Sequence, residues 1–185
     1  VPVPVDVHPP RPGKPAYMQR VRSWTPDAEG RLRSAHVDGD TLDEGVRRYH
    51  QTVAAVDEGV GALLACLEAS GQLRNTVIVF TSDQGFAWGE HGFSLKVAPY
   101  DANLRAPLVV AWPGRWPAGR VVRGAVSGVD LVPTLLRAAR VEPAWPLHGR
   151  DLHPLIETET AAAERPVLLT YTGWTFGRAT AAVPA

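Results

Sequence analysis

Residues 81–96, TSDQGFAWGEHGFSLK, bring an acid, an amide, a histidine and a lysine into one run. Asp83 and Gln84 directly follow a strand-like segment, and ligands of open α/β sheets gather outside the carboxyl ends of the strands. A carboxylate beside a side-chain amide offers hard oxygens that suit Ca²⁺ or Mg²⁺, whereas Zn²⁺ favours His or Cys. Gly85 permits a turn directly afterwards, and Lys96 supplies a compact cation for an anionic oxygen. These residue types are those of a site for a divalent metal ion and an anion.

A second interpretation of the same run is an ordinary polar loop. Ser-Asp-Gln-Gly is a good turn sequence, and an exposed Asp/Lys pair is usually solvated surface. His91 either faces the site through the GEHG turn or is a loop histidine held by the backbone. The residues alone leave both interpretations open.

Two unbroken apolar runs flank the loop and must position it. TVIVFT at 76–81 and PLVVAW at 107–112 lack alternation, which is typical of central strands covered on both faces. A helix is predicted before them, because Thr41 and Glu44 form a capping box and apolar residues recur at steps of three and four until Gly71. Helix, strand, loop and strand in this order predict an α/β sheet with parallel members.

The remaining chain divides by composition. Residues 1–41 are predicted to be an irregular Pro-rich segment over a surface, because alternating Val and Pro block a helix. A second helix is expected over 129–140, with Pro133 in its first turn. Residues 42–156 would form the main domain, and 157–185 the start of an incomplete C-terminal subdomain whose first strand is VLLTYT at 167–172.

The totals exclude several classes of protein. The 185 residues suffice for one domain, and no apolar run approaches the roughly 20 residues of a membrane span. Nineteen basic and nineteen acidic residues give a net charge of zero, which does not suit nucleic acid and leaves a small-molecule or sugar-like partner. The single cysteine, Cys66, forms no internal disulfide, and no signal peptide is readable after Val1.

Several motifs occur in an order that resembles the C-terminal part of the catalytic domain of type I sulfatases, in the alkaline-phosphatase-like superfamily. The resemblance covers residues 49–156: the helix from YHQTVAAVDEGVG, TSDQGFAWGEHG, then Lys96, Tyr100, Asp101, Arg105 and Pro107, followed by WPG, VDLVPTLLRAA and HGRDLHPLI. It implies an α/β fold, a partial alkaline-phosphatase-like sheet with flanking helices, lacking the N-terminal part of the catalytic domain.

The resemblance also implies roles for single residues. Asp83 and Gln84 look like the late pair of ligands to the family's divalent cation, usually Ca²⁺ or else one such as Mg²⁺, and Lys96 looks like the lysine that contacts the sulfate group. His91 is the candidate substrate contact. These sulfatases use a formylglycine made within a Cys/Ser-x-Pro-x-Arg motif, which no Cys or Ser of this chain satisfies, since LEAS follows Cys66. The formylglycine is therefore expected only in a missing N-terminal part.

Other residues receive structural roles. Tyr49 and Asp57 are expected to hold the helix in place, and Arg105 to brace the loop through Asp101. His8 is interpreted as surface, because the family's sulfate-contacting His-Pro element would precede Val1.

The sequence is compatible with three functions. The first is hydrolysis of sulfate esters, such as sulfated sugars, when the enzyme is complete. The second is a phosphodiesterase or phosphonate hydrolase of the same superfamily. The third is a non-catalytic truncated module that self-associates through exposed strand edges. The resemblance is compatible with an exported or periplasmic protein.

Overall fold

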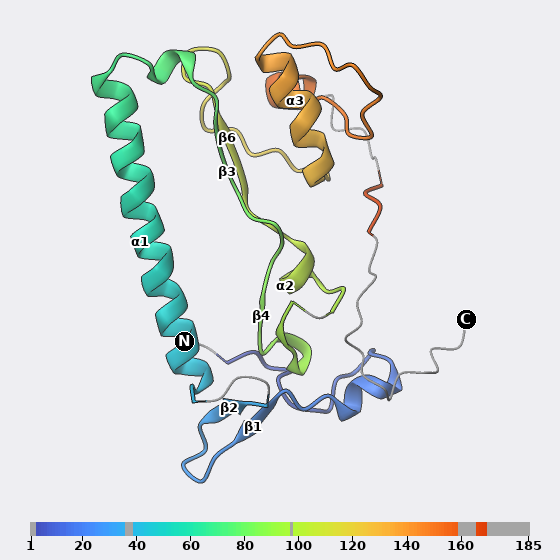
Figure 1. Ribbon diagram of the computed structural model, residues 1–185. Helices are drawn as coiled ribbons and strands as arrows, with labels where there is room; N and C mark the ends of the chain where they lie inside the picture. Colours follow the sequence, from blue (N-terminus) through green and yellow to red (C-terminus); the bar gives the residue numbers. More distant parts are fainter. Residues whose placement is uncertain (1–2, 36–38, 97, 159–165, 170–185) are drawn as a thin grey trace. The chain divides into compact units, whose positions relative to one another are not determined.

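The computed structural model describes residues 3–35, 39–96, 98–158 and 166–169 (Figure 1). By its contacts the chain divides into two compact units. The first combines the residues up to Ala62 with Gln84–Ala106, and the second combines Leu63–Asp83 with Pro107–Thr170. One of the boundaries between the units therefore falls between Asp83 and Gln84, within the loop that the sequence marks for chemistry.

The long helix α1, Leu42–Ala69, begins and ends where the sequence predicts. The Thr41 hydroxyl accepts the Glu44 backbone N–H at 3.3 Å, and the Glu44 carboxylate accepts the Thr41 N–H at 2.9 Å, so the capping box is present. At the other end Gly71 has φ +71°, and the N–H of Gln72 reaches back to the Leu67 carbonyl at 2.9 Å. This Schellman turn ends the helix because glycine adopts the left-handed conformation without a Cβ clash.

The first unit contains elements that the sequence did not predict. In place of an irregular segment, the structure has the 3₁₀ turn η1 (Ala16–Arg20) and an antiparallel hairpin of β1 (Trp24–Pro26) and β2 (Leu32–Ser34). The hairpin turn is stabilised by Asp27, whose carboxylate accepts the Arg31 backbone N–H at 2.8 Å. The shorter elements of this unit are β4 (Ala87–Trp88), η3 (Glu90–Gly92), β5 (Ser94–Leu95) and α2 (Asp101–Leu104).

The N-terminal segment contributes to the core of the first unit, contrary to the expectation of a surface covering. Val7, Trp24, Leu42 and Val46 form one buried cluster. A second cluster combines Met18 with Ala87, Phe93 and Ala98. The Trp24 indole N–H also donates to the Phe93 carbonyl at 2.8 Å, which joins the hairpin to the loop that follows β4.

The second unit contains the two predicted strands, as β3 (Ile78–Thr81) and β6 (Leu108–Ala111). They lie side by side and pair antiparallel, with Val79 opposite Val110, so the expected parallel pairing is wrong for these two strands (Figure 1). The expectation that both faces are covered is also wrong within the described residues, since Phe80 and Val109 are exposed. A strand pair joined by a long loop can return in either direction, and an apolar run does not encode which.

Two helices complete the second unit. The predicted helix over 129–140 is confirmed in a shorter form, as the 3₁₀ turn η4 (Gly128–Asp130) and α3 (Leu131–Ala138), with Pro133 in the first turn of α3. The shorter elements are η2 (Leu73–Asn75) and α4 (His153–Glu157). Trp116, Leu152, Leu155 and Ile156 form the buried cluster of this unit.

Polar groups connect α3 to the segment before α4. Asp130, which is 2% exposed, accepts the backbone N–H of Ser127 at 2.9 Å and that of Arg150 at 2.8 Å. The Thr134 hydroxyl donates to the Asp130 carbonyl and accepts the Leu152 N–H at 2.9 Å. Residues 150–152 are thereby fixed against the start of α3.

The predicted strand at 167–172 is only partly covered by the structure. Residues 167–169 are described without a strand, and residues 170–172 lie outside the described residues.

Candidate functional site

The candidate metal ligands lie immediately after β3. Asp83 and Gln84 are both exposed, and the Ser82 hydroxyl donates to the Asp83 carboxylate at 3.2 Å. Carboxylate and amide oxygens suit Ca²⁺ or Mg²⁺, so the pair fits such an ion in donor chemistry. Within the described residues no group of three or more His, Cys, Asp or Glu side chains could hold a metal ion. Because Ca²⁺ takes about six to eight oxygens, these two side chains alone are too few to complete the coordination of such an ion.

Gly85 fixes the backbone directly after Gln84. Its N–H donates to the Asn103 carbonyl at 2.9 Å, and a Cβ at this position would lie 2.1 Å from the Ala102 carbonyl oxygen. Any side chain would therefore push the loop away from α2. Glycine is required here by the close approach of two backbones.

Lys96 is an exposed residue held through its neighbours. Leu95 has φ +66°, a left-handed conformation that is disfavoured for a branched residue. The buried Asn103 side chain donates to the Leu95 carbonyl at 2.7 Å and stabilises this conformation. Backbone strain of this kind clusters at functional sites, and here it directly precedes the candidate cation.

Asn103 joins the segments that carry two of the candidate residues. Its carbonyl accepts the N–H of Gly85, next to Gln84, and its amide donates to Leu95, next to Lys96. Sequence reasoning missed this residue, because an asparagine in a short polar helix has no pattern that marks it. The one available signal was its position between Tyr100 and Arg105, inside the recognised motif.

His91 lies in η3 with φ +54°, and within the ranges that the structure describes its ring contacts a side chain and not a backbone group, contrary to one of the two expectations. The Asp6 carboxylate accepts the His91 backbone N–H at 3.0 Å and contacts the ring Nδ1. The His91 ring also packs on the Tyr100 ring, with the two centroids 4.3 Å apart. A side chain from the N-terminal segment therefore orients His91, and among the described residues the second ring nitrogen makes no hydrogen bond.

The two residues that contact the His91 ring, Asp6 and Tyr100, both have shifted pKa values. Partial burial of Asp6 opposes ionisation, but the hydrogen bonds from His91 outweigh it and lower the pKa of the Asp6 carboxyl group. Burial and the neighbouring Tyr17 raise the pKa of the Tyr100 phenol above its ordinary value. The Lys14 ammonium lies 4.5 Å from the Tyr100 ring centroid, a cation–π contact.

The predicted supporting residues have mixed outcomes. Arg105 pairs with Asp101 as predicted, at 3.7 Å, but both side chains are at least 80% exposed, so the brace is weak. Tyr49 packs against Trp88 with ring centroids 5.5 Å apart, which agrees with its predicted role on the helix. Asp57 is exposed on α1, and within the described part of the chain no contact of its side chain supports the role predicted for it. His8 is half-buried rather than fully on the surface.

Comparison with solved structures defines the class of fold. A complex described as a protein with its substrate D-glucosamine-2-N,6-O-disulfate matches with a TM-score of 0.60 and 42% identity over 64% of this chain and 24% of that chain. A phosphonate monoester hydrolase from Silicibacter pomeroyi matches with a TM-score of 0.52 and 33% identity, over 60% of this chain and 21% of that chain. The fold is therefore part of an alkaline-phosphatase-like domain, as the sequence predicted.

Comparison with protein families then identifies the chain. The sulfatase family model matches residues 2–141, and the chain belongs to the sulfatase family. An N-acetylglucosamine-6-O-sulfatase of Bacteroides thetaiotaomicron is 39% identical over 144 residues, which are 78% of this chain and 25% of that protein. The chain thus spans about a quarter of the length of this relative. Sulfatases in general use a divalent metal ion and a formylglycine residue.

Proposed function

We propose that this chain forms part of an enzyme that hydrolyses sulfate esters. The observation that carries the proposal is the family match, which includes the whole run from Asp83 to Lys96. The formylglycine nucleophile would come from outside these 185 residues, since none of their Cys or Ser residues precedes the required Pro and Arg. What this chain contributes is the binding and orientation of the sulfate group.

Asp83 and Gln84 would bind a divalent cation, Ca²⁺ by preference, through one carboxylate and one amide oxygen. Both side chains are exposed directly after a strand end, and Gly85 fixes the direction of the chain behind them. When bound, the ion would supply positive charge that offsets the charge of the sulfate oxygens. The remaining ligands must come from other segments, because the described residues offer no further cluster of acidic or histidine ligands around the pair.

Lys96 would place its ammonium group against a sulfate oxygen. Such a preorganised charge stabilises the negative charge that develops as the ester bond breaks, and it costs no reorganisation at that moment. The hydrogen bond from Asn103 to Leu95 supports this role by fixing the backbone on the N-terminal side of Lys96. His91 would contact the substrate through the ring nitrogen that does not face Asp6.

A sulfated sugar is the substrate class that the relatives favour. One relative is an N-acetylglucosamine-6-O-sulfatase, and one solved relative holds a disulfated glucosamine as its substrate. We extend this class, and no particular sugar, to the present protein.

The test uses the protein in a form that includes the formylglycine motif, assayed on an aryl sulfate and on a sulfated sugar. Lys96→Ala is expected to lower kcat by about 10²–10³, the usual effect of removing one charge-stabilising donor. Stability should change by less than about 0.5 kcal/mol, since Lys96 is exposed. Arg47→Ala on the exposed face of α1 removes a charge elsewhere and serves as the control. Unchanged turnover of Lys96→Ala would show that this lysine is ordinary surface.

Phosphonate monoester hydrolysis is the second candidate, favoured by the likeness to the Silicibacter pomeroyi enzyme. The same preparation should be assayed on a phosphonate monoester. A kcat/KM on that ester above the value on every sulfate ester tested would reverse the order of the two candidates.

A further inference from the structure

A groove in the second unit lies apart in sequence from the segment discussed above. Its volume is about 400 Å³, within the ordinary range of small-molecule sites. All of its lining residues belong to the second unit, so one compact body defines it. The principal lining side chains are Trp112, Arg115, Trp116, Arg137, Arg140 and His153.

Packed rings and hydrogen bonds hold one side of the groove. Trp116 contacts Trp112 and His153 edge to face, with ring centroids 5.6 and 5.2 Å apart. His153 is 8% exposed, and its Nδ1 lies 2.6 Å from the Asp151 carboxylate. These contacts make a rigid aromatic wall, which lowers the entropy that a ligand must overcome on binding.

Two arginines supply positive charge without a partner of opposite sign in the described part of the chain. The Arg115 guanidinium lies 4.7 Å from the Trp112 ring centroid, and the stacking restrains it. Arg140 has neither an ion pair nor a side-chain hydrogen bond there, whereas Arg137 pairs with Asp151 at 2.9 Å. Glu157 is the acidic residue of the lining. Arg115 and Arg140 are therefore the groups available to an anion.

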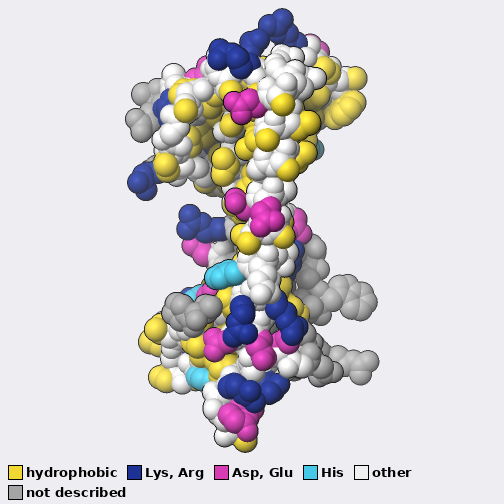
Figure 2. Space-filling view, turned by 90° about the vertical axis from the view of Figure 1, so that its left-hand side faces the viewer, with side chains coloured by type: hydrophobic (Ala, Val, Ile, Leu, Met, Phe, Trp, Pro, Cys, Tyr) yellow, Lys and Arg dark blue, Asp and Glu magenta, His cyan; other side chains and the backbone are white. Residues whose placement is uncertain are grey.

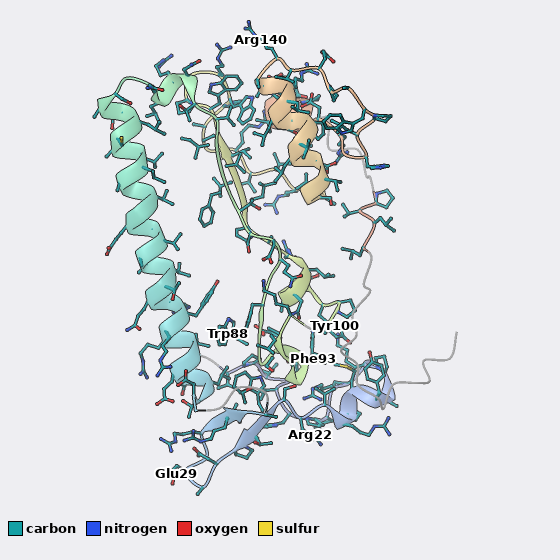
Figure 3. All side chains as sticks on the ribbon, in the orientation of Figure 1. Arg22, Glu29, Trp88, Phe93, Tyr100 and Arg140 are labelled. Carbon is teal, nitrogen blue, oxygen red and sulfur yellow. The ribbon has the colours of Figure 1, made fainter. Side chains whose placement is uncertain are left out.

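The backbone at Arg140 supports a role for its side chain. Arg140 follows α3 with φ +58°, at a position where the Val141 N–H bonds to the Leu136 carbonyl at 2.9 Å. Helices that end in this way usually have glycine at the left-handed residue, because a Cβ is disfavoured there. Arginine at this position extends from the end of α3 (Figure 3). A cation near a helix C-terminus also has a plain structural role, as it interacts favourably with the helix dipole.

We propose that this groove binds an anionic saccharide, whose acidic group pairs with the guanidinium of Arg115 or Arg140 and whose ring packs on the tryptophan wall. Guanidinium groups match sulfate and carboxylate oxygens in geometry, and aromatic side chains offer apolar surface to a sugar ring. The choice of a saccharide over other anions rests on the proposed function, since an enzyme for sulfated sugars meets such ligands. The site would bind the sugar without cleaving it.

The test measures binding to the 185-residue chain by saturation-transfer NMR, which observes the ligand and tolerates self-association of the protein. The probes are glucose 6-sulfate, glucuronic acid, glucose and inorganic sulfate. Glucose 6-sulfate or glucuronic acid should bind at least about tenfold more tightly than glucose, the usual scale for loss of a charged hydrogen bond. The two acidic sugars distinguish a sulfate from a carboxylate ligand. Equal binding of glucose, or of inorganic sulfate, would overturn the saccharide assignment.

Variants distinguish a ligand-binding role of the arginines from a structural role of Arg140 at the C-terminal end of α3. Arg140→Gly removes the guanidinium but suits φ +58°, so it should weaken binding about tenfold while the unfolding temperature stays the same or rises. Arg115→Ala should weaken binding similarly. Arg123→Ala, an exposed arginine outside the groove, is the charge-matched control and should bind like the parent. Parental binding by both Arg115→Ala and Arg140→Gly would overturn the proposal.

The outcome is independent of the catalytic test. Hydrolysis of sulfate esters by the complete enzyme, with no binding in this groove, would overturn this inference alone. Binding in the groove without hydrolysis would count against the proposed function alone.

Discussion

Asn103 is the residue on which the geometry of the candidate loop depends most. It is 5% exposed, and its two hydrogen bonds reach the neighbours of Gln84 and Lys96. An amide side chain suits this position because its nitrogen donates to the Leu95 carbonyl. The backbone carbonyl of the same residue accepts the Gly85 N–H. A carboxylate of the same shape would place an acceptor against the Leu95 carbonyl.

Asn103→Asp is therefore expected to destabilise the chain by about 1–3 kcal/mol, the cost of a buried acceptor without a donor. Amide hydrogen exchange across residues 84–96 should also accelerate. Asn75→Asp, an exposed position in η2, makes the same chemical change and should remain within about 0.5 kcal/mol of the parent. Chemical denaturation gives the stabilities, and equal values for the two variants would contradict the role of Asn103.

Asp6 gives the stability of the first unit a dependence on pH. Its folded pKa is lowered, so its contribution is fully present above the ordinary carboxyl pKa of about 3.9 and is lost as the pH falls towards the lower folded value. Asp6→Asn should cost about 1 kcal/mol at pH 7, and this difference should shrink below about pH 4. Unfolding curves at pH 7 and pH 3 measure it. Asp57→Asn, the same change on an exposed carboxylate of α1, should differ from the parent by less than about 0.5 kcal/mol at pH 7.

At this scale the sequence predicts candidate residues but not the contacts that hold them. Asp83, Gln84 and Lys96 stay predictions, made because their types and spacing match a known pattern. The contact between Asp6 and His91 joins residues 85 positions apart, and only the folded chain brings them together. Pairings of this kind leave no local pattern.

Helix α1 is the element whose ends are specified most clearly by local chemistry. Thr41→Ala removes the hydroxyl that accepts the Glu44 N–H and should cost about 1 kcal/mol. Thr52→Ala serves as the control within the same helix. Among the residues that the structure describes, the Thr52 hydroxyl donates only to the Arg48 carbonyl one turn before it, so alanine there should be neutral or slightly stabilising. If both variants lose the same stability in thermal unfolding, the capping box has no special part in stabilising α1.

The strands were less predictable than the helices, because their pairing depends on contacts between distant residues. Capping and periodicity are local, and they gave α1 and α3 within a few residues. The hairpin of β1 and β2 was missed because each strand has three residues and Pro26 ends the first, which is too short for alternation to show. The direction of β6 relative to β3 was predicted wrongly, because pairing depends on the path of the loop between them.

At the scale of the whole chain, several large apolar side chains stay exposed, because no other described residue packs over them. Phe80 and Val109 are exposed on β3 and β6, and Leu63 is exposed on α1. Figure 2 shows hydrophobic side chains gathered over the C-terminal part of α1 and its surroundings. Contiguous exposed apolar surface and two-stranded edges favour association. No helix among the described residues combines the length and hydropathy required to cross a bilayer.

The 185-residue chain by itself is expected to be inactive and associated. It has no residue in the formylglycine motif, so hydrolysis of a chromogenic aryl sulfate with Ca²⁺ present should not exceed background. Light scattering should give a mass above the 20.0 kDa of one chain. A monodisperse monomer that hydrolyses the ester would contradict both the assignment of the nucleophile and the interpretation of the apolar surface.

The polar connection between α3 and residues 150–152 has a consequence for how the chain can vary. Asp130 and Thr134 hold the C-terminal end of the intervening segment, and the hydrogen bond from Val141 to the Leu136 carbonyl holds its N-terminal end at α3. Residues 142–146 between them are exposed and belong to no helix or strand. A loop whose ends are fixed loses little free energy when it is lengthened, because the entropy of closure grows only slowly with length. Related proteins can therefore differ in the length of this loop without disturbing α3, and the loop offers a place where a peptide tag can be inserted.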